Sequence, residues 1–397
     1  MKRALLLFVM SIFIIPLVGM VEEEIIINDN DFSLELISST DQETIIEYSL
    51  GNFFRTPVEI DGETYYQLRL AKEANTFDKG EPELPKITRS IIIPDNALMA
   101  VQIIESEYVE YAMKIIPSKG LLSRSVNPED VPYEFGEVYL DDSFYPELRA
   151  ELGNPYIMRD FRGVTVNAYP FSYNPQTEIL RVYTYIVLKV ENIGLDTRNV
   201  KERTDNRVNR YFREIYSNHF LNFQQTRYDT IEEQGRIIVI SYGNFMDAMQ
   251  PYVDWKIQKG IQCDMYDVAD IGTSSAIYTF IQDEYELNDG LTFVLLVGDA
   301  AQVQPRNTDE DPTYGLMEGG DNYPEIFISR FSAENVAQVE TQVERTIHYE
   351  RDIDEGEWLH KGCGIASAQG VGDDGEYDNE HIDNIRDKLM NYTYTEV

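Results

Sequence analysis

Residues 292–299 read TFVLLVGD and residues 319–331 read GGDNYPEIFISRF. Each contains an apolar run of the length of a buried strand, and a loop rich in Gly, Asp and Glu joins them. Asp299, Asp321 and Glu325 stand at the ends of these predicted strands, and oxygen ligands of this kind suit Ca²⁺. The stretch predicts either a cation site or an acidic surface loop with a tight turn.

Strands and helices alternate around this stretch. After Gly235 the pattern predicts strands at residues 237–241, 263–268, 293–297, 326–328 and 364–368, and helices at 245–258, 274–287, 334–351 and 380–391. Such alternation is typical of a mostly parallel sheet with right-handed crossovers and helices on both faces. Ligands of these sheets bind beyond the carboxyl ends of the strands, where we expect residues 298–299 and 367–368.

The preceding region has a different pattern. Residues 25–190 contain short runs of alternating apolar and polar residues, such as TYYQLRL at 64–70 and RVYTYIVLKV at 181–190. Pro, Gly and Asn-Pro separate these runs, which predicts an antiparallel β-sandwich. Residues 196–209 lose both periodicities and indicate a linker that leads into a short helix near residues 211–223.

The size and net charge of the chain limit the kinds of molecule that it can bind. The chain has 397 residues, 43% of them hydrophobic, which is enough for two or three globular domains. Its 70 acidic and 33 basic residues give a formal net charge of -37. We therefore expect no nucleic-acid partner and no anionic-membrane partner.

The N-terminus has the layout of a secretory signal peptide. Lys2 and Arg3 precede an apolar run over residues 4–18, and Gly19 precedes an acidic stretch. An N-terminal anchor is the alternative, although the run is short for a membrane span and no later segment resembles one. We expect a secreted or cell-surface protein with no stable membrane span after signal removal.

The two cysteines, Cys263 and Cys363, do not suggest a disulfide scaffold. One disulfide is possible, but both lie in apolar, strand-like segments and are more simply interpreted as buried thiols.

Generic catalytic motifs are missing from the sequence: it has no Gly-x-Ser-x-Gly elbow, no phosphate-binding loop and no His-Glu-x-x-His helix. We expect no catalytic dyad of His360 and Cys363, because residues this close in sequence around a strand entry seldom bring their side chains together. His219 and His348 have no obvious partner.

A second acidic segment spans residues 367–383, SAQGVGDDGEYDNEHID. Its carboxylates could bind a second cation, or one could pair with a basic group of a substrate. The alternative is that they are helix-start residues favoured by the helix dipole, which leaves His381 without a role.

Five blocks in order resemble the start of the catalytic domain of gingipain-type cysteine peptidases: YVDWK at 252–256, FVLLVGD at 293–299, GDNYPEIFISRF at 320–331, RTIHYER at 345–351 and IASA at 365–368. The likeness covers about residues 236–397, and the β-rich region upstream resembles that family's pro-domain. The resemblance implies a caspase-like α/β fold, secretion as a zymogen and bound Ca²⁺.

Carried over by position, the resemblance implies one calcium site, a second metal site, a substrate-binding residue and an activation cleavage. The side chains of Asp299, Asp321 and Glu325 would bind Ca²⁺ together with the carbonyls of Glu318 and Tyr323. A second metal site would use Glu376 and His381, in a loop shorter than the family's. Asp378 matches the carboxylate that pairs with the basic substrate side chain before the scissile bond. Arg227 and Tyr228 match the activation cleavage.

The family's catalytic His and Cys have no match among these residues, and we expect them beyond Val397. The predicted organisation is therefore a signal peptide at 1–20, a β-rich pro-domain at 21–195, a linker with the activation site at 196–235, and a catalytic domain at 236–397 truncated before its dyad. We expect a calcium-binding cysteine endopeptidase zymogen whose own pro-domain inhibits it. The alternative is a non-catalytic calcium-binding pseudopeptidase, or a pro-domain-type inhibitor of a related peptidase.

Overall fold

The computed structural model describes residues 22–28, 32–123, 126–202, 207–223, 231–287, 290–307, 310–353, 356–368 and 377–397. The predicted signal peptide lies outside these residues. The strands of the first part are β1 (Glu23–Ile26), β2 (Ser33–Ser39), β3 (Glu43–Ser49), β4 (Asn52–Ile60), β5 (Glu63–Arg69), β6 (Ala74–Asn75), β7 (Pro85–Ile93), β8 (Ala97–Ala112), β9 (Ala150–Leu152), β10 (Tyr156–Met158), β11 (Phe161–Ala168), β12 (Phe171–Asn174) and β13 (Ile179–Leu195).

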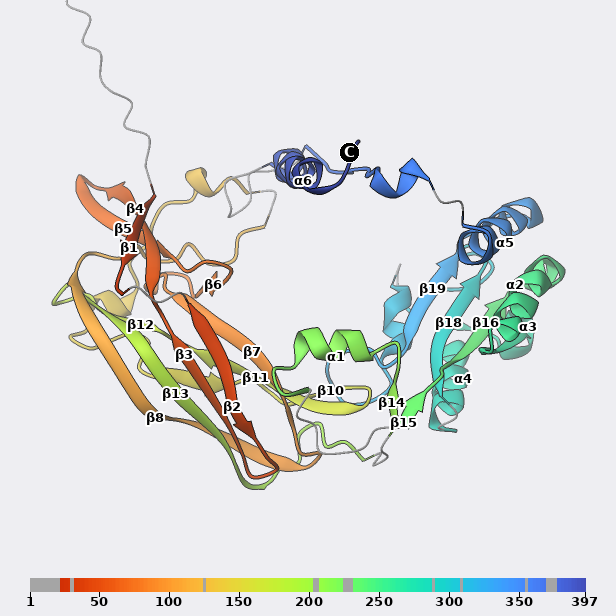
Figure 1. Ribbon diagram of the computed structural model, residues 1–397, viewed down its shortest axis with the longest axis horizontal. Helices are drawn as coiled ribbons and strands as arrows, with labels where there is room; N and C mark the ends of the chain where they lie inside the picture. Colours follow the sequence, from red (N-terminus) through yellow and green to blue (C-terminus); the bar gives the residue numbers. More distant parts are fainter. Residues whose placement is uncertain are drawn as a thin grey trace, which may run out of the picture.

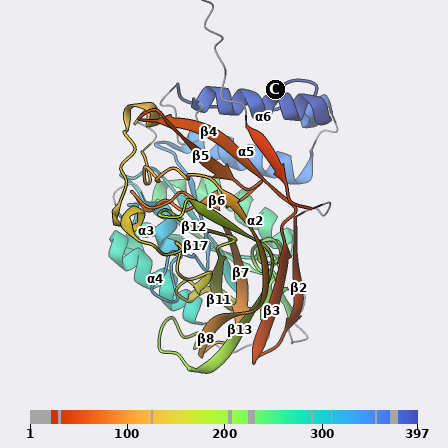
Figure 2. The ribbon, with the colours of Figure 1, turned by 90° about the vertical axis from the view of Figure 1, so that its left-hand side faces the viewer.

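These strands pair antiparallel in three sheets, which confirms the predicted strand-rich region. Their orders are β1-β4-β5, β10-β11-β7-β6 with β9 beside β11, and β12-β13-β3-β2 with β8 beside β13. Phe53, Ile91 and Ile186, one from each sheet, belong to a single buried core. Figure 2 views this part from the side away from the parallel sheet. The two-sheet sandwich stays a prediction.

The second part contains a parallel sheet of order β17-β16-β18-β19, as predicted. Its elements are β16 (Arg236–Ser241), α2 (Met246–Gln258), β17 (Gln262–Asp267), α3 (Val268–Ile271), α4 (Ser274–Glu286), β18 (Leu291–Val297), β19 (Phe327–Phe331) and α5 (Val336–Arg351).

Side chains of the central strand alternate between two buried layers because successive residues of a strand point to opposite faces. Ile237 and Val239 pack with residues of α2 and α5, whereas Ile238 and Ile240 pack with residues of α4. Helices therefore cover both faces of the sheet (Figure 1), which explains why β16 is apolar from Ile237 to Ile240.

The predicted strand at residues 364–368 is wrong. Residues 362–368 form no regular element, and the side chain of Ile365 is 86% exposed. Helix α6 (Asp378–Tyr392) follows and has no buried residue. In Figures 1 and 2 this helix lies away from the parallel sheet. An apolar run forms a strand only where another strand offers it hydrogen bonds, and this one has no such neighbour among the described residues.

A third group of elements lies between the two parts: β14 (Arg207–Asn209), α1 (Arg213–His219) and β15 (Ile231–Glu233). A cluster of aromatic and apolar side chains joins this group to β10 on one side and to β19 on the other. Its members include Tyr156, Phe212, Tyr216 and Phe220, with Phe327 packed against them. The short helix predicted near residues 211–223 forms as α1, and residues 207–223 belong to a buried junction.

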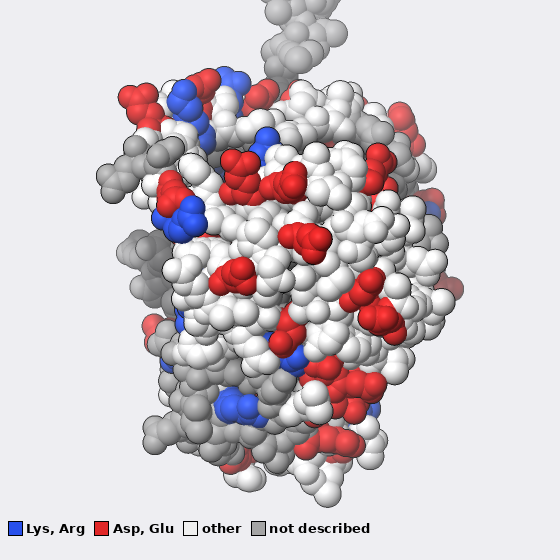
Figure 3. Space-filling view, turned by 90° about the vertical axis from the view of Figure 1, so that its right-hand side faces the viewer, with Lys and Arg blue, Asp and Glu red and all other residues white. Residues whose placement is uncertain are grey.

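The outer face of the α/β part bears many more acidic than basic side chains (Figure 3). In the described residues, no helix combines the length and the hydropathy that a membrane span needs.

We expect Ile240→Ala to lower the free energy of unfolding by about 2–5 kcal/mol, because it leaves a cavity between β16 and α4. The control is Ile257→Ala on α2, where the side chain is 55% exposed and the loss should stay below about 0.5 kcal/mol. Chemical denaturation of both variants measures the difference. Equal losses would contradict the packing described for β16.

Candidate functional site

The predicted metal ligands lie at opposite edges of the parallel sheet. Asp299 follows the carboxyl end of β18, where its backbone N–H donates to Ala333 O (3.0 Å). Glu325 comes two residues before β19 and lies at the amino edge, next to the start of β18. The five residues of β19 lie between Glu325 and Ala333, which corresponds to roughly 16 Å of strand.

Asp299 therefore lies away from Asp321 and Glu325, and the prediction that all three bind one calcium ion is wrong for Asp299. Both carboxylates stand beside a strand in the sequence, but one follows its strand and the other precedes its strand. In a parallel sheet these positions fall at opposite edges. The side chain of Asp299 instead accepts a hydrogen bond from Ser332 Oγ (3.3 Å).

Glu325 is completely buried at the amino edge. Its Oε2 accepts hydrogen bonds from the backbone N–H groups of Met317 (2.8 Å) and Glu318 (3.1 Å), while its Oε1 has no hydrogen-bond partner. Burial, together with the nearby carboxylates of Glu318 and Asp321, raises the pKa of Glu325 to about 8. A buried carboxylate with an open oxygen is unfavourable unless a proton or a cation neutralises it.

The loop around Glu325 is held by hydrogen bonds within the loop and from α4. Asp321 Oδ1 accepts from the N–H of Tyr323 (2.9 Å), and Glu318 Oε1 accepts from Tyr285 Oη (2.8 Å). Gly319 has a φ of 74°, a backbone conformation that favours glycine. The sequence motif Gly319-Gly320-Asp321 therefore forms the tight turn that either interpretation of this loop requires.

The donor chemistry of this loop fits a hard cation in part. Glu325 offers an open carboxylate oxygen, and Asp321 and the carbonyls of Glu318 and Tyr323 are oxygen donors in the same loop. No group of three or more His, Cys, Asp or Glu side chains is arranged to hold a metal ion in the described part of the chain. A cation would therefore be held by Glu325 and Asp321 together with backbone carbonyls, without Asp299.

Asp378 lies at the start of α6, where its Oδ2 accepts a hydrogen bond from Ser367 Oγ (2.7 Å). Glu380 completes a capping box because its side chain accepts from the N–H of Tyr377 (3.0 Å). His381 lies in the same first turn and is exposed. The helix-start interpretation therefore accounts for Glu380. Glu376, Arg227 and Tyr228 lie outside the described residues.

The cysteines differ from the prediction of two buried thiols. Cys263 is buried on β17, and burial raises its pKa to about 12. Cys363 is exposed, because the strand predicted around it does not form, and neither thiol is in a disulfide.

His219 has a partner that the sequence does not reveal: its Nε2 lies 2.7 Å from Tyr156 Oη, and burial lowers its pKa.

Two further residues of the junction carry no signal in the sequence. Arg159 and Asn199 come from the first part of the chain and contact the acidic loop directly. Both have positive φ, 45° and 41°, which a sequence pattern does not reveal for residues other than Gly.

Sequence comparisons divide the chain at the same junction. Residues 27–231 match the model of the C25 propeptide, and residues 230–396 match peptidase family C25. The chain is 36% identical over 377 residues to gingipain R2 of Porphyromonas gingivalis strain W83, covering 92% of this chain and 51% of that protein. It is 26% identical over 344 residues to Lys-gingipain HG66 of the same species, covering 81% of this chain and 20% of that protein. The chain thus spans about half the length of gingipain R2, or less for the other relative.

Among solved structures, the complex of the RgpB pro- and mature domains from P. gingivalis is similar, with 32% identity and a TM-score of 0.46. The similarity covers 49% of this chain and 97% of that chain. The two consecutive family matches and the identity with gingipain R2 lead to one conclusion: this chain belongs to the gingipain family of cysteine peptidases, family C25, and contains both its propeptide and peptidase regions.

Proposed function

We propose that this chain contains the pro-domain and peptidase-domain residues of an exported cysteine endopeptidase zymogen that cleaves after basic residues. The observation that carries this proposal is the pair of family matches, propeptide then peptidase, which meet at residues 230–231. The packing of the two regions over a shared aromatic cluster supports the role of the first region as a bound regulator of the second.

In the whole protein, a cysteine thiolate would attack the scissile carbonyl while a histidine transfers the proton. Cys263 is a poor candidate for that nucleophile because its burial raises its pKa and blocks access.

Asp378 is our candidate for selecting the basic substrate side chain. It lies at the N-terminus of α6, and the hydroxyl of Ser367 orients its carboxylate. A carboxylate held in this way could form a charge-assisted hydrogen bond with an arginine or a lysine of a substrate. Its place in the gingipain sequence pattern supports this role.

We expect Asp378→Asn in the whole protein to reduce kcat/KM for an arginine-directed peptide by about 10- to 100-fold, the loss of one charge-assisted pair. Steady-state kinetics with arginine, lysine and alanine peptides measure it. The control is Asp383→Asn on the same helix, where an exposed carboxylate pairs with Arg386 (3.3 Å) and activity should not change. An unchanged preference in Asp378→Asn would assign this residue to helix capping alone.

A protein that hydrolyses none of these peptides would contradict the peptidase proposal. Inhibition of an active gingipain by that same protein would instead support the alternative of a non-catalytic inhibitor.

We also propose that the loop of residues 317–325 binds Ca²⁺ through Glu325, with Asp321 and the carbonyls of Glu318 and Tyr323. The support is the buried, unpartnered Oε1 of Glu325 beside two further carboxylates. A bound cation would supply the positive charge that this carboxylate lacks, and so would stabilise the folded state.

In the presence of a chelator, we expect stability to fall as the pH rises from about 5 to 8. The folded-state pKa of Glu325 is raised from 4.5 to about 8, so the folded state binds this proton more tightly than the unfolded state. The resulting stability is fully present below pH 4.5 and is lost as the pH passes through about 8. Denaturation of the wild type and of Glu325→Gln across this range measures the difference. A slope that Glu325→Gln does not reduce would contradict the assignment.

Addition of Ca²⁺ above pH 8 should raise the thermal midpoint, because the ion binds only the folded state. Glu325→Gln should abolish this response. Asp299→Asn should preserve it, because Asp299 lies at the other edge of the sheet. Thermal scans with calcium and with chelator test the three proteins. A response lost in Asp299→Asn but kept in Glu325→Gln would overturn the proposed ligand set.

A further inference from the structure

The acidic loop of residues 317–325 contacts the pro-domain at several points. Tyr323 stacks on Tyr156 of β10, with ring centroids 4.2 Å apart and planes 21° apart. Asp321 Oδ2 accepts a hydrogen bond from the backbone N–H of Ile157, also on β10 (2.9 Å). The carbonyl of Glu325 accepts from Arg159 Nη1 (2.7 Å). These contacts bring the turn between β10 and β11 onto the loop.

Arg159 extends this contact onto the sheet itself. The same Nη1 donates to the carbonyl of Leu291, the first residue of β18 (2.8 Å). The guanidinium also lies over the rings of Phe212 (5.4 Å) and Tyr285 (5.7 Å), and Arg159 is only 6% exposed. The pro-domain therefore contacts the amino edge of the parallel sheet, away from Asp299 at the carboxyl edge.

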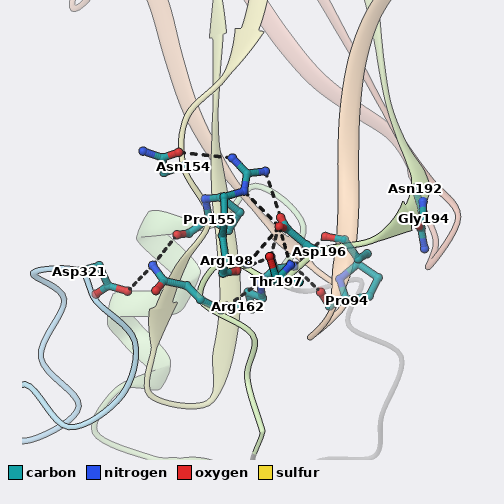
Figure 4. A network of polar contacts seen from close by, with 12 residues as sticks. Pro94, Asn154, Pro155, Arg162, Asn192, Gly194, Asp196, Thr197, Arg198 and Asp321 are labelled. Atoms are coloured by element: carbon teal, nitrogen blue, oxygen red, sulfur yellow. Dashed lines mark hydrogen bonds and ion pairs between the residues drawn. The ribbon is translucent and has the colours of Figure 1, made fainter.

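Asn199 uses its whole side-chain amide at this interface. Its Oδ1 accepts from the N–H of Gly320 (2.9 Å), and its Nδ2 donates to Pro155 O (2.8 Å) and to Asp321 Oδ2 (3.4 Å). One side chain thus ties the strand entry at Pro155 to two consecutive residues of the loop. Figure 4 shows Asp321 beside Pro155 and the network behind them.

Arg162 holds Asn199 in position from inside the pro-domain. Its Nε donates to the carbonyl of Asn199 (2.7 Å) and its Nη2 to the carbonyl of Arg198 (2.9 Å). Asn199 has a φ of 41°, a conformation that costs free energy unless the surroundings fix it. The backbone is therefore set before the side chain meets the loop, so that docking orders little additional chain.

We propose that the loop of residues 317–325 is the surface by which the peptidase domain holds its pro-domain, and that Asn199 is the residue that recognises it. Because this surface lies at the amino edge, it does not overlap the carboxyl edge, where ligands of parallel sheets bind. These contacts do not involve the linker, so they should hold the pro-domain on the peptidase domain after the linker is cut. This inference rests on the proposed role of the pro-domain as a separable regulator.

The retention of a cut pro-domain tests this proposal. The full chain would carry one specific protease site within residues 224–230, be cut while folded, and be passed over a size-exclusion column. The two pieces of the wild type should elute together. Asn199→Ala should speed their dissociation by at least about tenfold, because it removes hydrogen bonds that include one to a carboxylate. Asn199→Asp should release them faster still, since it faces Asp321 with a like charge.

The double variant Asn199→Asp/Asp321→Asn removes the like charge, so its pieces should separate more slowly than those of Asn199→Asp. They should still separate faster than those of the wild type, because a carboxylate at position 199 cannot donate to Pro155 O and an amide at position 321 cannot accept from both Ile157 and Tyr323. The control is Asn192→Ala, whose side chain accepts only from the N–H of Gly194 (3.0 Å) within the pro-domain, and it should behave as the wild type. Separation of the cut wild type, equal retention in Asn199→Ala, or equal release by Asn192→Ala would each overturn the proposal. If the Asn199→Asp variant does not fold, the dissociation rate of Asn199→Ala tests the proposal alone. The readout needs no peptidase activity, so it stands or falls separately from the proposed function.

Discussion

The buried guanidinium of Arg162 is the interaction on which the junction of the two domains depends. A charge with no solvent exposure is costly unless every donor is used, and here all the N–H groups of the side chain are. They donate to the carbonyls of Pro94, Ala97, Arg198 and Asn199 and to the carboxylate of Asp196. Arg198 in turn hydrogen-bonds Asp196 and lowers its pKa well below the ordinary value. One side chain thus fastens the segment after β13 to the turn between β7 and β8.

The direction of the strands determines at which edge of the sheet this junction lies. Strands β16, β17, β18 and β19 run parallel, so their amino ends share one edge and their carboxyl ends the other. The pro-domain meets the amino edge through Arg159 and Asn199, next to Glu325. The same short loop therefore provides both the proposed cation ligands and the surface on which the pro-domain rests. Asp321 accepts from the pro-domain through Oδ2 and from Tyr323 within the loop through Oδ1.

The sequence predicts the α/β part well, because buried strands and amphipathic helices repeat with different periods, and β16, α2, β17, α4, β18 and α5 all lie where those periods place them. It fails at residues 364–368, since an apolar run does not show whether a partner strand exists. It also groups Asp299 with Glu325, although Asp299 follows its predicted strand and Glu325 precedes its own, an order that already places the two at opposite edges of a parallel sheet. Arg159, Arg162 and Asn199 are invisible for another reason: a polar residue in a β-rich region is normally solvated, and only the folded chain shows these buried.

The most direct test of this account is hydrogen exchange at the backbone amides of Ile157 and Gly320. The first donates from the pro-domain to Asp321, and the second donates from the loop to Asn199. If docking on the loop holds the domains together, both amides should be protected to a similar degree and should lose protection together under mild denaturant. Rapid exchange of both amides under conditions in which the strands of each domain stay protected would show that the loop is free of the pro-domain, and would contradict the account.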